Sequence, residues 1–331
     1  MTRRAGRQLA LGVGCALAAG LMWGLVFVAP VMLSEYPPLV LSAGRYLAFG
    51  LIALAVAATD LSALRRLAPA DWAQAARLSL VGNLLYYTFL AAGIQLAGVP
   101  LPTVLIGTLP VVIAIAANAS EGALPWRRLA PSLAVITLGV LLVNHTELAR
   151  LGAGDETGLA RYALGGLLAI GAVACWAWYP IRNANWLREH PTCSPATWST
   201  AQGLTTLPLS LAGAVAAWAQ LRVSTTGTGT EPFDFPLGPQ PALFVGLMLV
   251  LGLCASWLGT LLWNQASRLL PTSLTGQLIV FETLSALLYG FIWRGQTPAP
   301  LALTGIALLV LGVVIGVRAF HLAPQSAASS A

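Results

Sequence analysis

The sequence contains no lysine, and all 17 of its basic residues are therefore arginines. Charged residues of both signs make up only 8% of the 331 residues, whereas soluble domains average about 25%. The absence of lysine excludes a phosphate-binding loop of the Walker type, which requires that residue. The shortage of charge, together with 57% hydrophobic residues, indicates a chain that lies in lipid, where the bilayer replaces a globular core.

Cysteine and histidine are also scarce, and their spacing excludes several kinds of site. The four cysteines, Cys15, Cys175, Cys193 and Cys254, are scattered along the chain, and the three histidines, His145, His190 and His321, are far apart from one another. No pair has the short spacing of a metal centre or a redox motif. We therefore expect no metal, no cofactor and no catalytic cluster, and the sequence favours a protein that is not an enzyme.

Three arginines, Arg3, Arg4 and Arg7, precede an uncharged run that begins at Gln8 and ends at Ser34, a pattern that resembles a secretory signal. The run is much longer than the apolar core of a signal, which has about 7–15 residues. We interpret it as a retained first membrane span. In a soluble protein the net charge of +6 would suggest a nucleic-acid partner, but here it fits arginines in cytoplasmic loops.

Charged residues and prolines divide the chain into apolar segments of membrane-spanning length. Arg77 and Glu121 enclose 43 uncharged residues, too many for one helix at about 20 residues per crossing, and Gly98–Pro102 divides them. Ten spans are predicted: 8–30, 38–58, 74–96, 101–119, 128–145, 162–182, 195–219, 241–265, 272–293 and 299–318. The predicted fold class is therefore an all-α integral membrane protein with ten transmembrane helices.

The arginines are distributed unequally between the two sides of the membrane. With the N-terminus inside, 12 lie at the inner side, 4 at the outer side and Arg45 within a span. The inner group comprises Arg3, Arg4, Arg7, Arg65, Arg66, Arg77, Arg127, Arg128, Arg182, Arg188, Arg268 and Arg318. Because positive residues accumulate on the cytoplasmic side, we predict a multi-pass protein of the cell inner membrane with both ends in the cytoplasm.

The first five spans resemble the last five. Trp23 parallels Trp176, and Arg45 parallels Gln202, in matching positions of the two halves. Because five is an odd number, the second copy enters the membrane in the opposite direction, and such inverted repeats are typical of transporters that alternate access to a central site. The predicted organisation is a first repeat at 8–145, an outer connection at 146–161, a second repeat at 162–318 and a disordered cytoplasmic tail at 319–331.

An ordered set of residues resembles the drug/metabolite transporter superfamily, specifically its EamA family. The set comprises Trp23–Gly24, Pro37–Pro38, Arg45, Pro110, Glu121, Phe281–Glu282 and the run Gly305–Gly312. The resemblance covers about residues 10–318. It implies two inverted EamA-like five-helix repeats and the export of small metabolites. The chain departs from the family where Thr283 follows Glu282, a position that is often proline.

Glu282 stands near the middle of the apolar run Leu274–Trp293. A charge at bilayer depth costs at least about 2.5 kcal/mol, so such residues usually serve function. In a central cavity this carboxylate could bind a cationic amine or take up a proton when the cavity faces one side of the membrane. The structural alternative is a pair that locks two helices together. Glu282 has no acidic counterpart in the first repeat, where Leu109 takes its place, which argues against a purely architectural role.

Arg45 lies about two turns into the second span and could bind a substrate carboxylate. Alternatively, its long side chain reaches the outer interface or pairs with Glu35. If Arg45 and Glu282 both face the cavity, they suit a zwitterion such as an amino acid, or they could neutralise each other. Gln202, opposite Arg45 in the repeat, is a further candidate for the cavity.

Aromatic residues lie within several spans, and three of them are candidates for the cavity wall. Trp23, Trp176 and Tyr179 could stack on an apolar or cationic substrate. The alternative is contact with lipid or a place in the interfacial belt. The predicted substrate-binding residues are thus Glu282, Arg45, Gln202, Trp176, Tyr179 and Trp23.

The function that these observations favour is a secondary transporter that exports small metabolites, such as amino acids or related amphiphiles, by alternating access. Efflux of cationic drugs is the alternative within transport. An integral membrane enzyme or a lipid-handling scaffold is the alternative from another class, and it would need clustered groups at one membrane face. The expected partners are a small-molecule substrate, the lipid bilayer, protons as candidate coupling ions and a second copy of the chain in a homodimer.

Overall fold

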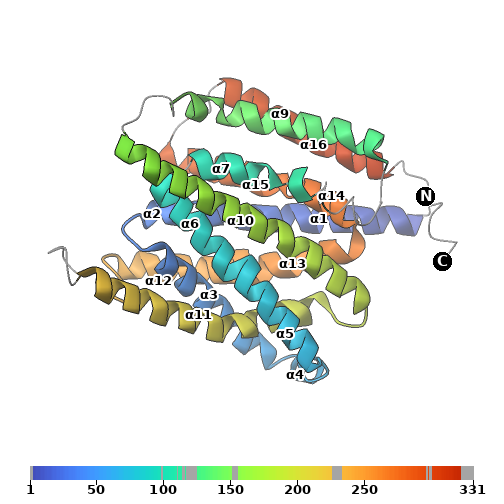
Figure 1. Ribbon diagram of the computed structural model, residues 1–331. Helices are drawn as coiled ribbons and strands as arrows, with labels where there is room; N and C mark the ends of the chain where they lie inside the picture. The colour runs from blue at the N-terminus through green and yellow to red at the C-terminus, as the bar shows by residue number, and fades with distance from the viewer. Residues whose placement is uncertain are drawn as a thin grey trace.

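The computed structural model describes residues 3–97, 100–109, 111–113, 116, 125–150, 156–225, 233–295, 297 and 300–321. All regular secondary structure in these residues is helical. The helices lie side by side in one bundle, and α1 begins at the same end of the bundle at which α16 finishes (Figure 1). The fold class predicted from composition is therefore confirmed as far as its all-helical, apolar character.

Seven helical segments are long and apolar enough to cross a membrane. They are Gly6–Met32, Pro38–Ala57, Pro69–Ala97, Ala160–Glu189, Pro195–Arg222, Pro241–Leu269 and Leu274–Trp293. A shorter apolar stretch, Pro300–Gly316, lies in α16 (Pro300–His321). The two remaining predicted spans correspond to α7 (Pro100–Gly107) and α9 (Trp126–Arg150). In the predicted fourth span, at 101–119, residues 110, 114, 115 and 117–119 lie outside the described residues, and so does Glu121 after it.

The first span comprises α1 (Arg3–Gly24), a short turn of 3-10 helix at Leu25–Phe27 and α2 (Ala29–Met32). The second is α3 (Pro38–Ala57), which begins at the proline that the sequence placed there. The short helix α4 (Leu61–Leu64) lies in the following connection. A proline at the first helical position is favourable because its missing N–H would have no partner within the helix.

The third and eighth spans share an unusual construction. The third comprises α5 (Pro69–Leu78), a π-helical stretch at Ser79–Leu85 and α6 (Tyr86–Ala97). The eighth comprises α12 (Pro241–Val250), a π-helical stretch at Leu251–Leu258 and α13 (Gly259–Leu269). In each span the π-helix starts ten residues after the opening proline, at Ser79 after Pro69 and at Leu251 after Pro241. Such stretches are rare and often mark functional sites.

Several helices extend beyond their predicted ends. α9 continues to Arg150 and α10 (Glu156–Glu189) starts at Glu156, so much of the predicted connection at 146–161 is helical. α11 (Pro195–Thr225) and α16 likewise pass their predicted ends, and the predicted tail at 319–331 begins as helix as far as His321. The backbone hydrogen bonds of a helix continue into polar flanks, whereas the predicted ends followed the apolar composition. Residues 322–331 lie outside the described residues.

The ninth span consists of α14 (Thr272–Leu278) and α15 (Val280–Arg294), separated at Ile279. α15 packs against α1, and two small residues on α1 permit the close approach. A Cβ atom on Gly20 would lie 3.0 Å from the backbone nitrogen of Glu282, and one on Gly24 would lie 2.5 Å from Cβ of Ser285. This small-xxx-small spacing is a common device for close helix packing in membranes, and here it fixes the position of Glu282.

Candidate functional site

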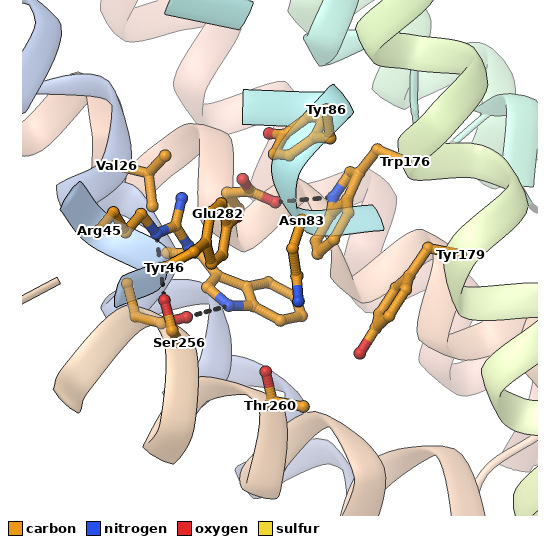
Figure 2. A pocket seen from close by; sticks show the side chains of 12 residues that line it. Val26, Arg45, Tyr46, Asn83, Tyr86, Trp176, Tyr179, Ser256, Thr260 and Glu282 are labelled. Atoms are coloured by element: carbon orange, nitrogen blue, oxygen red, sulfur yellow. Dashed lines mark hydrogen bonds between the residues drawn. The ribbon is translucent and has the colours of Figure 1, made fainter. Parts of the chain in front are cut away.

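A small cavity lies within the bundle, between helices from both halves of the chain (Figure 2). Its volume is about 10 Å³. That is about enough for one water molecule. Twelve residues line it: Trp23, Val26, Arg45, Tyr46, Asn83, Tyr86, Trp176, Tyr179, Ala255, Ser256, Thr260 and Glu282. Five of the six residues predicted to bind substrate are among them, and Gln202 is the exception.

Glu282 lies in the first turn of α15, just after the break at Ile279, and only 2% of the residue is exposed. The N-terminal end of a helix carries a partial positive charge, which stabilises a carboxylate at that position. Its Oε2 atom accepts a hydrogen bond of 3.3 Å from the indole N–H of Trp176. The carboxylate therefore faces the cavity from one side while an aromatic neighbour on α10 holds it (Figure 2).

Arg45 lies on α3 and is 4% exposed, so it does not extend to the membrane surface. Its Nε–H donates to Oγ of Ser256 over 3.1 Å, and its guanidinium carbon lies 4.8 Å from the ring centres of both Tyr46 and Tyr87. The Nη1 atom is buried without a hydrogen-bond partner. Among the described side chains, Arg45 and Glu282 form no ion pair, although both line the cavity.

Aromatic rings form one wall of the cavity. Trp176 is stacked between Tyr86, at 4.8 Å and 19°, and Tyr179, at 5.2 Å and 6°. Trp23 meets Trp176 edge-on at 4.9 Å, and its indole N–H donates to the carbonyl oxygen of Ala255 over 2.8 Å. The alternative that Trp23, Trp176 and Tyr179 face lipid is therefore wrong. Stacked rings are rigid, and their faces attract cations as well as apolar groups.

Gln202 lies behind the cavity wall instead of lining it. Its Oε1 accepts from the hydroxyl of Tyr179 over 2.9 Å, and its Nε2 donates to Oδ1 of Asn183 over 3.2 Å. Asn183 also accepts from the indole of Trp198 over 2.9 Å and donates to Oδ1 of Asn264 over 2.8 Å. This buried network joins α10, α11 and α13. Gln202 therefore orients Tyr179, which lines the cavity, and does not itself line the cavity as its repeat position predicted.

The π-helical stretches place polar groups at the cavity that the predicted set lacked. Asn83 comes from the first stretch and Ser256 from the second, and Thr260 lies one turn after Ser256. Tyr46, the neighbour of Arg45 in sequence, completes the wall. Two signals in the sequence could have indicated these residues. Asn83 is an amide within an apolar span, and the four-residue spacing of Ser256 and Thr260 places both hydroxyls on one helix face.

A second polar cluster lies at the C-terminal end of α10. Asp71 accepts from the indole N–H of Trp186 over 3.1 Å, and its Oδ1 lies 3.4 Å from Nε2 of His190. In the turn that follows, Arg268 donates to the carbonyl oxygen of Cys193 over 3.2 Å. Burial raises the pKa of the Cys193 thiol to about 11, against a smaller lowering by Arg268. These contacts attach the C-terminal end of α10 and the connection that follows it to the first turn of α5, through Asp71, and to the last turn of α13, through Arg268.

Comparisons with known proteins agree with this architecture. Residues 10–145 match the EamA-like transporter family. The inner membrane protein YtfF of Escherichia coli (strain K12) is 51% identical over 312 residues, which cover 93% of this chain and 95% of that protein. A protein of known crystal structure superposes with a TM-score of 0.68 at 19% identity, over 95% of this chain and 99% of that one. That likeness concerns the fold alone. The chain belongs to the EamA-like transporter family of membrane proteins.

Proposed function

We propose that the protein is a secondary transporter that exports small metabolites, such as amino acids or related amphiphiles, by alternating access around the cavity of Figure 2. The observation that carries this proposal is the placement of Glu282 and Arg45. Two buried ionisable side chains line one cavity at the centre of an apolar bundle without pairing. Charges at bilayer depth are expensive, and such residues usually serve a substrate or ion pathway.

The pairing of the helices supports two inverted five-span repeats, at 8–145 and 162–318 with an outer connection between them. The first span packs against the eighth and ninth, and the sixth packs against the third and fourth. If each span of the first half is exchanged for the corresponding span of the second half, the first span becomes the sixth and the eighth and ninth become the third and fourth. The two sets of contacts are therefore equivalent. The second span packs on the seventh and the fifth on the tenth, pairs that the exchange leaves unchanged. The matching π-helical stretches of the third and eighth spans obey the same relation.

The size of the cavity supports a mechanism in which the halves move. At about 10 Å³ the cavity has room for about one water molecule and not for an amino acid. A substrate must therefore enter through a state in which helices separate on one side of the membrane and leave through a state in which they separate on the other. The break at Ile279 and the two π-helical stretches interrupt regular helices beside the cavity, where such a motion needs pivots.

Glu282 is the proposed site of proton coupling. The ionisable side chains that face it across the cavity are Arg45 on α3, Tyr46 on α3, Tyr86 on α6 and Tyr179 on α10. Protonation would remove the negative charge from the cavity and change its affinity for a cationic group. The distribution of arginines, 12 inside and 4 outside, supports an inner-membrane orientation with both termini in the cytoplasm.

Efflux of organic cations is the second candidate, and the aromatic wall is the observation that favours it. A carboxylate beside stacked rings is a suitable environment for a cation. Arg45 argues against cation efflux, because a cationic substrate would bring a second positive charge into the same small cavity. Competition between organic cations and amino acids for transport separates the two candidates.

The proposal is tested by the metabolites that cells release when they overproduce the protein, compared with cells that lack the gene. We expect a defined set of small metabolites to accumulate outside the overproducing cells, and Glu282→Gln to abolish that accumulation. Glu189→Gln is the matched control, because Glu189 is exposed at the end of α10. Equal extracellular profiles in overproducing and deleted cells would refute export.

A further inference from the structure

We infer that the cavity contains an anion-binding subsite, formed by Arg45 and Ser256, which makes an anionic group an obligatory part of the substrate. The inference rests on the proposed transport function and names the class of its substrates. These are dipolar molecules with a carboxylate or similar anion at Arg45 and a cationic group at Glu282. Organic cations that lack an anionic group are excluded.

Arg45 has a buried nitrogen, Nη1, without a hydrogen-bond partner. Arg45 is only 4% exposed, and its buried Nη1 atom donates to no acceptor. The rings of Tyr46 and Tyr87 lie beside the guanidinium, but they offer no oxygen to accept its N–H groups. A buried, charged donor without an acceptor is strongly unfavourable. An acceptor brought by a ligand would satisfy it, and Arg45 lines the cavity that a ligand would occupy.

Glu282 is the carboxylate among the residues that line the cavity. Glu282 accepts from Trp176 and forms no ion pair with Arg45, in the part of the chain that the structure describes. In Figure 2 the two side chains lie on the same cavity, while their dashed bonds lead to different partners, Ser256 and Trp176. The cavity therefore keeps a positive and a negative group apart. A molecule that carries both charges can bridge them.

Ser256 lines the cavity beside Arg45. Its Oγ accepts the Nε–H of Arg45, which leaves the hydroxyl proton of Ser256 for another acceptor. A carboxylate has two oxygens and can accept from Arg45 and from Ser256 together. Ser256 belongs to the π-helical stretch Leu251–Leu258, which sets its place beside the guanidinium. The Trp23 indole holds the same stretch by its bond to the carbonyl oxygen of Ala255.

The consequence is discrimination by the substrate's anion. A site built to hydrogen-bond one group rejects analogues without that group by large factors, because its buried polar atoms then remain unpaired. We therefore expect an amino acid to be transported at least about 100-fold faster than the amine formed by its decarboxylation. A site for cations alone would show the reverse order.

The test uses the purified, full-length protein in proteoliposomes loaded with an equimolar mixture of the common amino acids and the amines formed by their decarboxylation. Release of each compound is followed by mass spectrometry. The wild type is expected to release amino acids and retain amines. Arg45→Gln is expected to lose this preference, and Ser256→Ala to reduce it by about tenfold, because one donor remains. Arg161→Gln is the control, since Arg161 is exposed on α10 and remote from the cavity.

The outcomes separate the subsite from transport itself. Release of amines and amino acids at equal rates by the wild type would refute the anion subsite and leave the transporter intact. Release of neither set would refute the proposed transport of amino acids, and the inference with it. If Arg45→Gln does not fold, as judged by gel filtration and thermal unfolding, Ser256→Ala decides. A preference that Ser256→Ala leaves unchanged would then overturn the inference.

Discussion

Asn183 offers a sharp test of the polar network behind the cavity, because one amide joins three helices. It is fully buried and bonds to Trp198 at 2.9 Å, Gln202 at 3.2 Å and Asn264 at 2.8 Å. Asn183→Leu keeps a side chain of similar size but removes all three bonds. The substitution also leaves three groups without this partner: the indole N–H of Trp198, the side-chain amide N–H of Gln202 and the amide oxygen of Asn264.

The expected loss of stability follows from these three bonds. Hydrogen bonds between membrane helices contribute about 0.6 kcal/mol each on average, which gives about 2 kcal/mol for three. Unsatisfied buried partners cost about 1–3 kcal/mol each, so the total rises to about 5 kcal/mol when two of them find no water and each costs about 1.5 kcal/mol. We therefore predict that Asn183→Leu lowers the free energy of unfolding by about 2–5 kcal/mol.

The assay is reversible unfolding of the purified protein in mixed micelles of a mild detergent and sodium dodecyl sulfate, followed by tryptophan fluorescence. Asn185→Leu is the matched control, since the hydrogen bond that the described residues show for the amide of Asn185 comes from Arg188, one turn away at the exposed end of α10. We expect this control to lose less than about 0.5 kcal/mol. Equal losses for the two variants would show that the hydrogen bonds of Asn183 do not stabilise the fold.

Two further predictions concern helix packing and thiol chemistry. Gly24→Val should reduce stability by about 1–3 kcal/mol and impair transport, because its Cβ would lie 2.5 Å from that of Ser285. Gly14→Val on the same helix, where nothing lies within 4 Å, should be tolerated in thermal unfolding. Cys193, with its pKa raised to about 11, should react slowly with iodoacetamide at neutral pH and about tenfold faster for each unit of rising pH, in a mass-spectrometric assay. A fast, pH-independent reaction would contradict the burial of this thiol.

Seven of the ten predicted spans correspond to helical segments long and apolar enough to cross a membrane, because charges are rare and lie between the apolar runs. The helix ends were less accurate, since helices such as α10 continue into polar flanks that composition assigns to loops. The π-helical stretches could not be predicted. Their seven or eight residues differ from a regular helix only in hydrogen-bond register, which no residue type specifies.

The site was predicted in part, for a physical reason that differs among its residues. Glu282 and Arg45 stand out because an ionisable residue within a span is rare and costly. Whether they form a pair depends on side-chain orientation and on the positions of Ser256 and Trp176, which come from distant spans. Gln202 was expected in the cavity from its repeat position. Instead, Tyr179 lines the cavity, and Gln202 lies behind it and accepts the hydrogen bond of the Tyr179 hydroxyl.

The most direct test of the central claim, that transport operates through Glu282, is the rate of metabolite release from proteoliposomes across a series of pH values. We predict that the wild type and Glu282→Asp show pH-dependent release, because both keep a carboxyl group that can gain and lose a proton. Glu282→Gln cannot, and any release that it retains should be independent of pH. A pH profile for Glu282→Gln that matches the wild type would show that transport does not depend on protonation of Glu282.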